Sequence, residues 1–430
     1  MKIAFYVPNQ GLKNIDFSKP QNGNPGTGAA EYLHVALPYY INSRDVTAYI
    51  YAQDINNMPS RIGCVECSSI RDAAYKASQN KIDIFVFRPR IQEEDGILDL
   101  IDELKLASVG RAALTPSAQH QRKMAKSKYF KALVAVGSEQ FDYMCDSPVS
   151  TKLTYIDNGI SVPAADRFNY VQKNRNLVTY MGAIVPQKGF HVLARVWPEV
   201  IKRNPNAELR VIGSSKIYNE NYAVGPLGIA DAEYERNYII PYLCDSEQNL
   251  LPSVKFLGAL GDEKYEHLTE SLVSVPNPTG QTETCCVSAI EMQACGAAVV
   301  SGAYYALLGT VHHNQTGLLG RGDNQLTNNI CYLLENPEVA IDFGENGKAR
   351  VRERYDFEVV SKKWMQLFSS IENGKVWKPK HEFKYIRYHR KWLRMANYYI
   401  KKLNMFNFFL PSVQEVEHFV INFVKNAKNR

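Results

Sequence analysis

Two glutamates, Glu283 and Glu291, stand eight positions apart in a stretch that could bind a sugar and a phosphate. The stretch reads GQTETCCVSAIEMQACGAAVVS from Gly280 to Ser301, which predicts a loop, a helix ending near Gly296 and a short buried strand. Eight residues at about 100° each place both carboxylates on similar sides of that element. Carboxylates accept hydrogen bonds from sugar hydroxyls, and the amides of a helix N-terminus bind phosphate. An amphipathic helix with two solvated glutamates explains the same spacing.

A glycine loop near the N-terminus supplies a second candidate for phosphate contact. Gly26 and Gly28 lie between a predicted first strand and a helical pattern from Ala29 to Ile41, which is the general arrangement of an anion site. The dinucleotide fingerprint G-x-G-x-x-G is not met, because Glu31 stands where the third glycine would be. Taken alone, this loop is weak evidence for a nucleotide.

Other polar residues directly follow predicted strands, at the edge where doubly wound sheets bind ligands. A histidine in such a place can act as a general base or a sugar contact, and a hydrogen-bonded structural histidine fits equally well. The candidates are Arg88 and Arg90 after the strand 83–87, His120 after the strand 110–114, and Gly182 and Lys188 after the strand 177–181.

The elements that must position these residues alternate between strand and helix, which indicates an α/β protein with parallel, doubly wound sheets. A chain of 430 residues is too long for one ordinary core, so we expect two domains, 1–170 and 171–374, followed by a tail, 375–430. A helix capped by Asp356 is expected to close the second domain, and the long connection 214–252 to form a functional flap or an added subelement. The predicted strands are 2–7, 45–51, 83–87, 110–114, 132–136, 153–156, 177–181, 207–213, 254–258 and 272–276.

The composition is that of a soluble globular protein, with 45% hydrophobic and 22% charged residues and no apolar run long enough to span a bilayer. The first residues, MKIAFYVPNQ, lack the apolar region of a signal peptide, so we expect a cytoplasmic protein. The eight cysteines are expected to be reduced. Cys64 and Cys67 form a C-x-x-C, but no second pair stands at the spacing of a zinc site.

Several motifs together resemble the retaining glycosyltransferases of family 4, which have the GT-B fold. They are YMGAIVPQKG from Tyr180, then AELRVIGSS and VKFLGAL, and above all Glu283-x7-Glu291 followed by QACGAAVVS. The segment YIDNGIS at 155–161 resembles the interdomain turn of that family. The resemblance covers roughly residues 1–372 and is looser in the N-terminal half.

The resemblance implies two Rossmann-like domains that face each other across a cleft, with a nucleotide-sugar donor on the C-terminal one and an acceptor on the N-terminal one. Glu291 would then hold the ribose hydroxyls, Glu283 would contact the donor sugar and Lys188 would pair with the diphosphate. The resemblance also places His120 with the catalytic candidates and Arg88 and Arg90 on the acceptor side. The remaining donor contacts it implies are Gly26, Gly28, Gly182, Thr284, Cys285, Cys286 and Val287.

The expected activity is transfer of a sugar from a UDP- or GDP-sugar to a glycan or a lipid-linked acceptor, with retention of the anomeric configuration. No cofactor is expected. No metal is expected either, since the chain has no D-x-D pair and Lys188 with helix amides can neutralise the diphosphate.

Two positions depart from the family's pattern. Ala183 follows Gly182 where an arginine is usual, and Cys285 and Cys286 replace part of the usual E-x-F-G sequence. We interpret both as subfamily variation. A non-catalytic nucleotide-sugar-binding partner protein is the main alternative, and a GT-B sugar-nucleotide epimerase, which needs no acceptor, is another.

The tail 375–430 carries most of the positive charge. It holds 13 Lys and Arg against 3 Asp and Glu, whereas residues 1–374 hold 37 and 41. From Tyr385 to Leu403 the apolar residues fall mostly at helical steps with basic residues between them, and a shorter amphipathic helix follows Pro411. We therefore expect peripheral contact with an anionic membrane surface on the cytoplasmic side. The alternative is a helical pair packed on the protein, with buried aromatics and solvated charges. Nothing else in the chain suggests nucleic acid.

Overall fold

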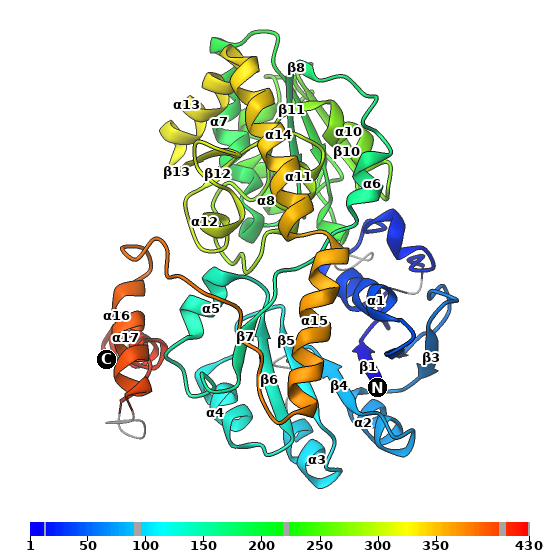
Figure 1. Cartoon of the computed structure of the whole chain (residues 1–430). Helices are drawn as coiled ribbons and strands as arrows, with labels where there is room; N and C mark the ends of the chain where they lie inside the picture. Colours follow the sequence, from blue (N-terminus) through cyan, green and yellow to red (C-terminus); the bar gives the residue numbers. More distant parts are fainter. Residues whose placement is uncertain (13, 90–95, 218–222, 404–409, 429–430) are drawn as a thin grey trace.

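Two parallel β-sheets, each flanked by helices, form two domains that lie one above the other (Figure 1). The computed structural model describes residues 1–430 except 13, 90–95, 218–222, 404–409 and 429–430, and of residues 422–428 it describes the backbone alone. The two doubly wound domains, the α/β class and the helical tail confirm the fold expected from the sequence.

The N-terminal domain is built on a seven-stranded sheet in the order β3-β2-β1-β4-β5-β6-β7. The six strands expected in this half all form, within a few residues of their predicted ends. The edge strand β3 was not predicted, because its sequence GCVE is short and only half-buried. The strands are β1 (Lys2–Val7), β2 (Thr47–Ala52), β3 (Gly63–Glu66), β4 (Ile84–Phe87), β5 (Ser108–Ala112), β6 (Phe130–Ala135) and β7 (Leu153–Tyr155).

The C-terminal domain is built on a six-stranded sheet in the order β10-β9-β8-β11-β12-β13. Its central strands are buried on both faces, as helices on both sides of a parallel sheet require. The edge strand β13 was not predicted, because GLLG contains two glycines. The strands are β8 (Asn174–Met181), β9 (Glu208–Ile212), β10 (Val254–Gly258), β11 (Ser271–Val275), β12 (Ala298–Gly302) and β13 (Gly317–Gly320).

The helices connect these strands in the alternating order that parallel sheets need. The predicted helix from Ala29 to Ile41 forms with those bounds as α1. The helices are α1 (Ala29–Ile41), α2 (Ile70–Gln79), α3 (Ile97–Glu103), α4 (Ala118–Lys126), α5 (Ser138–Met144), α6 (Val162–Asp166), α7 (Phe190–Arg203), α8 (Ala232–Tyr238), α9 (Ile240–Leu243), α10 (Lys264–Glu270), α11 (Val287–Ala294), α12 (Leu307–Thr310), α13 (Asp323–Glu335), α14 (Pro337–Arg354), α15 (Phe357–Glu372), α16 (Lys391–Lys402) and α17 (Val413–Lys428). No helix of the described residues combines the length and hydropathy that crossing a membrane requires.

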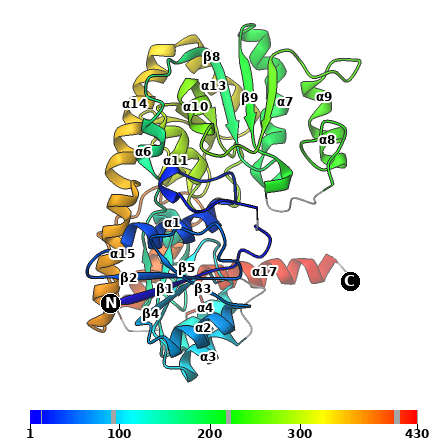
Figure 2. The ribbon, with the colours of Figure 1, turned by 90° about the vertical axis from the view of Figure 1, so that its right-hand side faces the viewer.

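The helix α15 returns the chain from the C-terminal to the N-terminal domain (Figures 1 and 2). Asp356 caps it as expected, by accepting a hydrogen bond from the Glu358 amide. Its apolar face packs on the N-terminal sheet, where Trp364 and Phe368 join a core cluster with Phe5 of β1. The sequence places this helix with the second domain, and the structure packs it against the first. The reason is a pair of backbone hydrogen bonds between Ile160 and the segment 355–357, which turns the chain toward the N-terminal sheet.

The connection 214–252 contains the short helices α8 and α9, which pack against α7 at the side of the C-terminal sheet. The buried carboxylate of Glu235 organises the described part of it by accepting hydrogen bonds from the amides of Leu227, Ile229 and Ala230. Ile217 reaches the large cavity described below. The proposed role of this connection as a functional flap stays a prediction.

The tail follows α15 and ends in α16, which packs beside α5, and α17, which packs against α16 (Figure 1). The helix α16 begins at Lys391, so Tyr385, which we placed on it, lies before its first turn and has a left-handed backbone, φ 53°. Figure 2 shows α17 extending beyond the N-terminal domain. The tail is therefore attached to the folded protein.

The packing of α15 predicts a stability effect. Trp364→Ala should lower the free energy of unfolding by about 3–5 kcal/mol, because it leaves a large cavity against the N-terminal sheet. Gln366→Ala, at an exposed position on the same helix, is the matched control and should change little. Urea unfolding followed by circular dichroism measures both. Equal stabilities of the two variants would mean that α15 does not contribute to this core.

Candidate functional site

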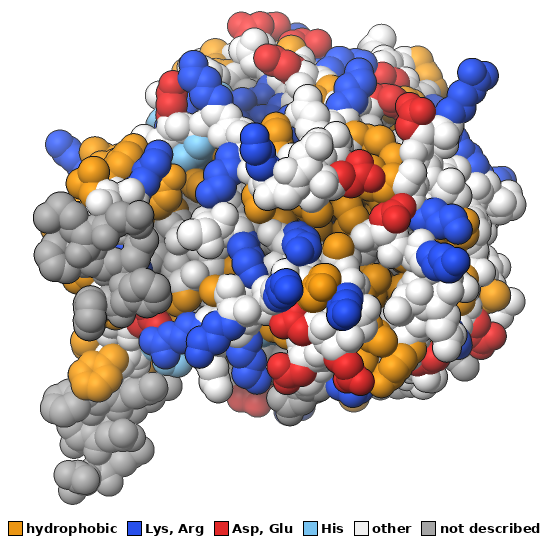
Figure 3. All heavy atoms as spheres, turned by 60° about the horizontal axis from the view of Figure 1, so that its bottom comes forward, with side chains coloured by type: hydrophobic (Ala, Val, Ile, Leu, Met, Phe, Trp, Pro, Cys, Tyr) orange, Lys and Arg blue, Asp and Glu red, His pale blue; other side chains and the backbone are white. Residues whose placement is uncertain are grey.

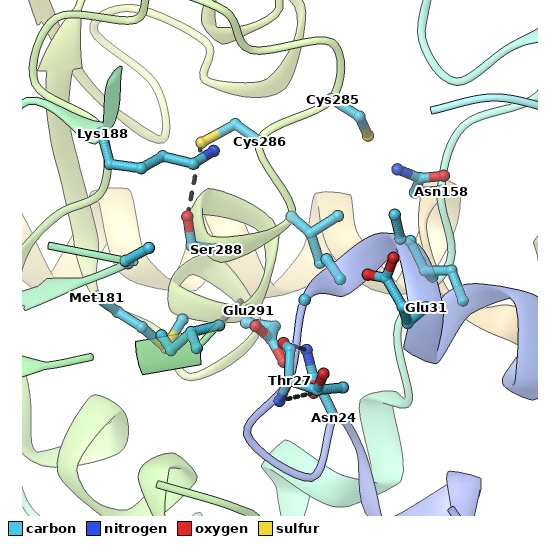
Figure 4. A pocket seen from close by; sticks show the side chains of 18 of the residues that line it. Asn24, Thr27, Glu31, Asn158, Met181, Lys188, Cys285, Cys286, Ser288 and Glu291 are labelled. Atoms are coloured by element: carbon cyan, nitrogen blue, oxygen red, sulfur yellow. Dashed lines mark hydrogen bonds between the residues drawn. The ribbon is translucent and has the colours of Figure 1, made fainter. Parts of the chain in front are cut away.

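A cavity of about 450 Å³ lies where the two domains face each other, and we call it the cleft cavity. Residues of both domains line it (Figure 4). From the N-terminal domain come the glycine loop, the start of α1, and residues at the ends of β4 and β5. From the C-terminal domain come the loop after β8, residues of α10, and the stretch from Thr282 to Glu291. This is the crevice at the carboxyl ends of the strands in which doubly wound proteins bind ligands.

The two glutamates that first drew attention both line the cleft cavity. Glu283 lies in the loop before α11, and Glu291 lies within that helix, which Cys286 precedes and a left-handed Gly296 follows. Their side chains are only 8% and 6% exposed. The structure therefore rules out a surface helix with two solvated glutamates, and the predicted order of strand, loop, helix and strand is confirmed by β11, α11 and β12.

Glu283 is held by two partners. Lys188, from the turn after β8, places its ammonium 2.7 Å from Glu283 Oε1. Asn277 donates from Nδ2 to the same oxygen at 3.0 Å, and to the carbonyls of Gln187 and Gln281. Asn277 thus fixes the Lys188 turn against the Glu283 loop. Sequence reasoning missed Asn277, whose one visible signal is its position directly after a buried strand.

Glu291 is held by the helix α10. Lys264 Nζ lies 2.9 Å from Glu291 Oε1, and Tyr265 donates its hydroxyl to the same oxygen at 2.9 Å. Burial raises the pKa of Tyr265 well above its usual value, so the hydroxyl stays protonated and remains a donor. Lys264 also donates to the carbonyl of Asn24 in the other domain, at 3.1 Å. Neither residue was predicted, because an ordinary amphipathic helix contains the same residue types.

The glycine loop is shaped by Asn24. Its Oδ1 accepts from the amides of Gly26 and Thr27, and its Nδ2 donates to the carbonyl of Thr27 (Figure 4). Gly26 has φ 91° and comes so close to the backbone of Leu260 that a Cβ there would lie 3.0 Å from that carbonyl oxygen. Gly28 then precedes the first turn of α1. The predicted loop thus meets the C-terminal domain across the cleft cavity.

Two arginines line the N-terminal side of the cleft cavity. Arg88 follows β4 and pairs with Glu31 at 2.8 Å, and Arg111 of β5 donates to Asn158. Both side chains are buried, and burial followed by repulsion from Arg88 lowers the pKa of Arg111 to about 9. Within the described chain, Arg88 Nε and Nη2 and Arg111 Nη1 have no hydrogen-bond partner. Arg111 was not predicted, because it lies inside a strand.

The turn between the glutamates is strained and closely packed. Thr282 and Cys286 adopt left-handed backbones, φ 61° and 35°, which cost free energy in residues other than glycine. Burial raises the pKa of Cys285 and of Cys286 to about 12, so neither thiol ionises at neutral pH. Thr284 donates to the carbonyl of Ala113 in the other domain at 2.8 Å. This turn therefore forms a contact between the domains at the wall of the cleft cavity.

Most of the candidates from the sequence come together here. Lining the cleft cavity are Gly26, Gly28, Arg88, Gly182, Lys188, Glu283, Thr284, Cys285, Cys286, Val287 and Glu291. His120 is not among the described lining residues; it lies on α4, and its side chain is buried. Arg90 lies outside the described residues. In the described part of the chain, no cluster of three or more His, Cys, Asp or Glu is arranged to hold a metal ion.

Comparison with known proteins agrees with this arrangement. Residues 163–350 match the family described as glycosyl transferases group 1. The chain is 26% identical, over 198 residues, to a GDP-mannose-dependent monoacylated alpha-(1-6)-phosphatidylinositol monomannoside mannosyltransferase of Corynebacterium glutamicum, covering 44% of this chain and 45% of that protein. The chain thus matches about half the length of such curated relatives.

Solved structures of low identity share the fold. Sucrose-phosphate synthase from Thermosynechococcus elongatus superposes with a TM-score of 0.65 at 15% identity, covering 87% of this chain and 100% of the other. HepE of Anabaena in complex with UDP-glucose gives a TM-score of 0.60 at 16% identity, covering 86% and 100%. The fold is GT-B. The match to the glycosyl transferases group 1 family covers residues 163–350, which contain most of the motifs that resemble the retaining family 4.

The buried pair of Lys264 and Glu291 predicts a coupled stability effect. Lys264→Met and Glu291→Gln should each lower the free energy of unfolding. For Lys264→Met the loss should be about 3–5 kcal/mol, because this variant leaves the buried carboxylate of Glu291 without its cation. The double variant should lose much less than the sum of the two. Denaturant unfolding of all four proteins measures the coupling.

The control for this cycle is the exposed pair of Arg175 and Glu338, whose side chains are 60% and 74% exposed. Arg175→Met and Glu338→Gln should be nearly additive and cost at most about 1 kcal/mol. Additive losses at Lys264 and Glu291 as well would show that the two side chains do not interact as the structure places them.

Proposed function

We propose that the protein is an active glycosyltransferase that moves a sugar from a nucleoside-diphosphate sugar to an acceptor hydroxyl, with retention of configuration and without a metal ion. The bond from the anomeric carbon to the diphosphate breaks, and a bond from that carbon to the acceptor oxygen forms. The acceptor hydroxyl loses its proton, and the nucleoside diphosphate leaves. The observation that carries the proposal is the cleft cavity, which gathers two buried glutamates, each with its own lysine, at the N-terminus of α11 and opposite a glycine loop.

The donor end of the proposal follows from charge and geometry. Lys188 is still 28% exposed although it pairs with Glu283, so its ammonium can also meet the diphosphate. The first amides of α11 add partial positive charge, and the two together stabilise the charge that develops on the leaving group. Glu291 is assigned to the ribose hydroxyls and Glu283 to the donor sugar. In support, HepE was solved with UDP-glucose and the Corynebacterium relative is named for GDP-mannose, so UDP- and GDP-sugars are the donors to test first.

The acceptor end is assigned to the N-terminal side of the cleft cavity. Two guanidinium groups, those of Arg88 and Arg111, lie there with one carboxylate, that of Glu31, which leaves a local excess of positive charge. That excess favours an acceptor with an anionic group. The name of the Corynebacterium relative specifies a phosphatidylinositol mannoside, which supports a lipid-linked acceptor over a free glycan.

The tail supports a membrane location for that acceptor. Eleven of the eighteen large hydrophobic side chains that are exposed in the described chain lie from Ile386 onward, so the tail concentrates apolar surface. We call this set the tail patch; its members are Ile386, Trp392, Leu393, Tyr399, Ile400, Leu403, Leu410, Val416, Phe419, Val420 and Ile421. Figure 3 shows Lys and Arg side chains near the tail and across the lower face of the N-terminal domain, with hydrophobic and some acidic side chains among them. Apolar side chains beside cations suit an anionic bilayer surface.

The donor assignment predicts the effect of removing the Lys188 ammonium. A thermal-shift screen against UDP-, GDP- and ADP-sugars identifies the donor, and release of the nucleoside diphosphate then measures turnover. Lys188→Ala should lower turnover by roughly ten- to a thousandfold, the scale of losing one group that stabilises developing charge. Lys202→Ala, an exposed lysine on α7, is the control.

Four results would contradict parts of this assignment. An unchanged rate in Lys188→Ala would remove Lys188 from the diphosphate site. Loss of turnover in EDTA that manganese or magnesium restores would contradict a metal-independent reaction. Binding of the nucleotide-sugar without turnover under all conditions would favour a non-catalytic partner protein. Conversion of the nucleotide-sugar to its epimer in the absence of an acceptor would favour an epimerase.

The tail patch predicts binding to vesicles. The full-length protein should float with vesicles that contain phosphatidylglycerol, and less so as salt rises, because salt screens the cationic part of the attraction. The triple variant Trp392→Gln, Leu393→Gln, Phe419→Gln should lose flotation. The control replaces three exposed tyrosines elsewhere, Tyr75, Tyr170 and Tyr238, by Gln and should float like the wild type.

The membrane assignment would be overturned if the patch variant and the wild type float to the same extent, or if neither protein floats at low salt. If the wild type instead forms a dimer that the patch variant abolishes, the tail patch is an interface between copies of the chain.

A further inference from the structure

A second cavity, of about 270 Å³, adjoins the cleft cavity, and we call it the tail cavity. The turn Thr282–Thr284 lines both, so Glu283 stands between them. The other walls come from α5 of the N-terminal domain, from Tyr305 after β12, and from His389, Lys391 and Arg394 of the tail. A group in the tail cavity would therefore lie next to the carboxylate assigned to the donor sugar. The tail residues that line it are outside the part of the chain that matches the family, 163–350.

Buried charges hold the tail in this position. The Lys391 ammonium lies 2.7 Å from Glu139 and 2.8 Å from Asp142, both on α5. All three side chains are at most 8% exposed. His381 approaches the other oxygen of Asp142 at 2.5 Å. Removing one member of such a buried set leaves an unpaired charge, which is costly, so this wall of the tail cavity is firmly attached.

An aromatic pair forms another part of the wall of the tail cavity. The rings of Tyr305 and His389 stack with centroids 4.1 Å apart and planes 19° from parallel. The amide of Tyr305 donates to His389 Nε2 at 3.2 Å, so in a neutral imidazole the proton is on Nδ1, which stays a donor. Both residues have left-handed backbones, φ 45° and 49°. Strain of this kind at two adjoining residues is typical of a wall whose geometry serves a ligand.

The chemistry of these walls suits one sugar ring. Aromatic faces pack against the apolar face of a pyranose, and carboxylate oxygens and an imidazole N–H hydrogen-bond its hydroxyls. Tyr305 is 40% exposed, so its ring is only partly covered by His389. The volume is below the roughly 300–1,000 Å³ of pockets for drug-sized ligands, which favours a single ring over an oligosaccharide.

We propose that the tail cavity binds the sugar ring of the acceptor, and that Tyr305 and the tail residue His389 are specificity-determining residues for it. The inference rests on the proposed function, since it needs a donor sugar beside Glu283. The tail then has two roles: it lines the acceptor site, and it contacts the membrane. An acceptor held here would present a hydroxyl past the turn Thr282–Thr284 into the cleft cavity, where an anionic group beside that hydroxyl would meet Arg88 and Arg111, and its lipid portion would extend along α16.

The test compares Tyr305→Asn and His389→Asn with the wild type. Asparagine tolerates the left-handed backbone better than other non-glycine residues, so each variant removes a ring and keeps the chain's path. The control is Tyr332→Asn, an exposed tyrosine on α13 away from both cavities. Methyl glycosides of glucose, galactose, mannose and N-acetylglucosamine are the probes, since they have a sugar ring and no chain that could bind the tail patch. Saturation-transfer NMR measures their binding to protein saturated with the nucleoside diphosphate of the donor.

At least one methyl glycoside should bind the wild type and Tyr332→Asn alike, and about tenfold more weakly to Tyr305→Asn and His389→Asn, the scale of losing one stacked ring. The nucleotide affinity of all four proteins should be equal. Binding of no glycoside to the wild type, or equal binding to all four, would overturn the inference. Failure of the nucleotide to bind any of the four proteins would instead mean that the proposed function fails.

Discussion

The structure depends on one buried ion pair, Lys264 with Glu291, located where the two domains meet. Lys264 is 4% and Glu291 6% exposed, so neither charge can be solvated separately. Lys264 also donates to the Asn24 carbonyl, and Asn24 in turn shapes the glycine loop of the other domain. The position of a carboxylate on α11 is thereby tied to the position of a loop some 265 residues earlier in the chain, and the two walls of the cleft cavity are set together.

The second glutamate is held differently, and the difference fits its proposed chemistry. Glu283 pairs with Lys188, which keeps 28% of its surface exposed and faces the cavity. A cation that is partly solvated can exchange water for phosphate at little cost, whereas the buried Lys264 cannot leave Glu291 without leaving a charge unpaired. The E-x7-E spacing thus places one carboxylate in a fixed, binding environment and the other beside an adaptable cation. The usual arginine is absent at Ala183, and among the described residues the cations that line the cleft cavity are Lys188, Lys264, Arg88 and Arg111.

The sequence predicted the fold well and the site in part. Alternating buried strands and amphipathic helices carry a strong local signal, which is why eleven strands and α1 were located and only the edge strands β3 and β13 were missed. Most of the lining residues that were found lie in loops after strands, where glycines and charges stand out. Asn24, Asn277, Lys264 and Arg111 act through contacts with residues far away in the chain, and no local pattern marks such contacts. For the same reason α15 was assigned to the second domain. Its amphipathic pattern shows that it packs on a sheet, but the pattern does not show which sheet.

In the tail helix α16, basic side chains are buried and apolar side chains are exposed, which is the reverse of what the composition suggests. Helical periodicity led us to expect either basic residues facing a membrane or aromatics buried against the protein. In the structure Lys391 and Arg394 are the buried residues, paired with Glu139, Asp142 and Glu417. Trp392, Leu393 and Tyr399 are exposed instead. The reason is that α5 presents carboxylates, so the basic face of α16 gains more by pairing there than by hydration. Once that face is inward, the apolar face must point outward. A single helix then joins two surfaces, one lining a cavity beside Glu283 and one suited to lipid, and a lipid-linked sugar is the acceptor that would contact both.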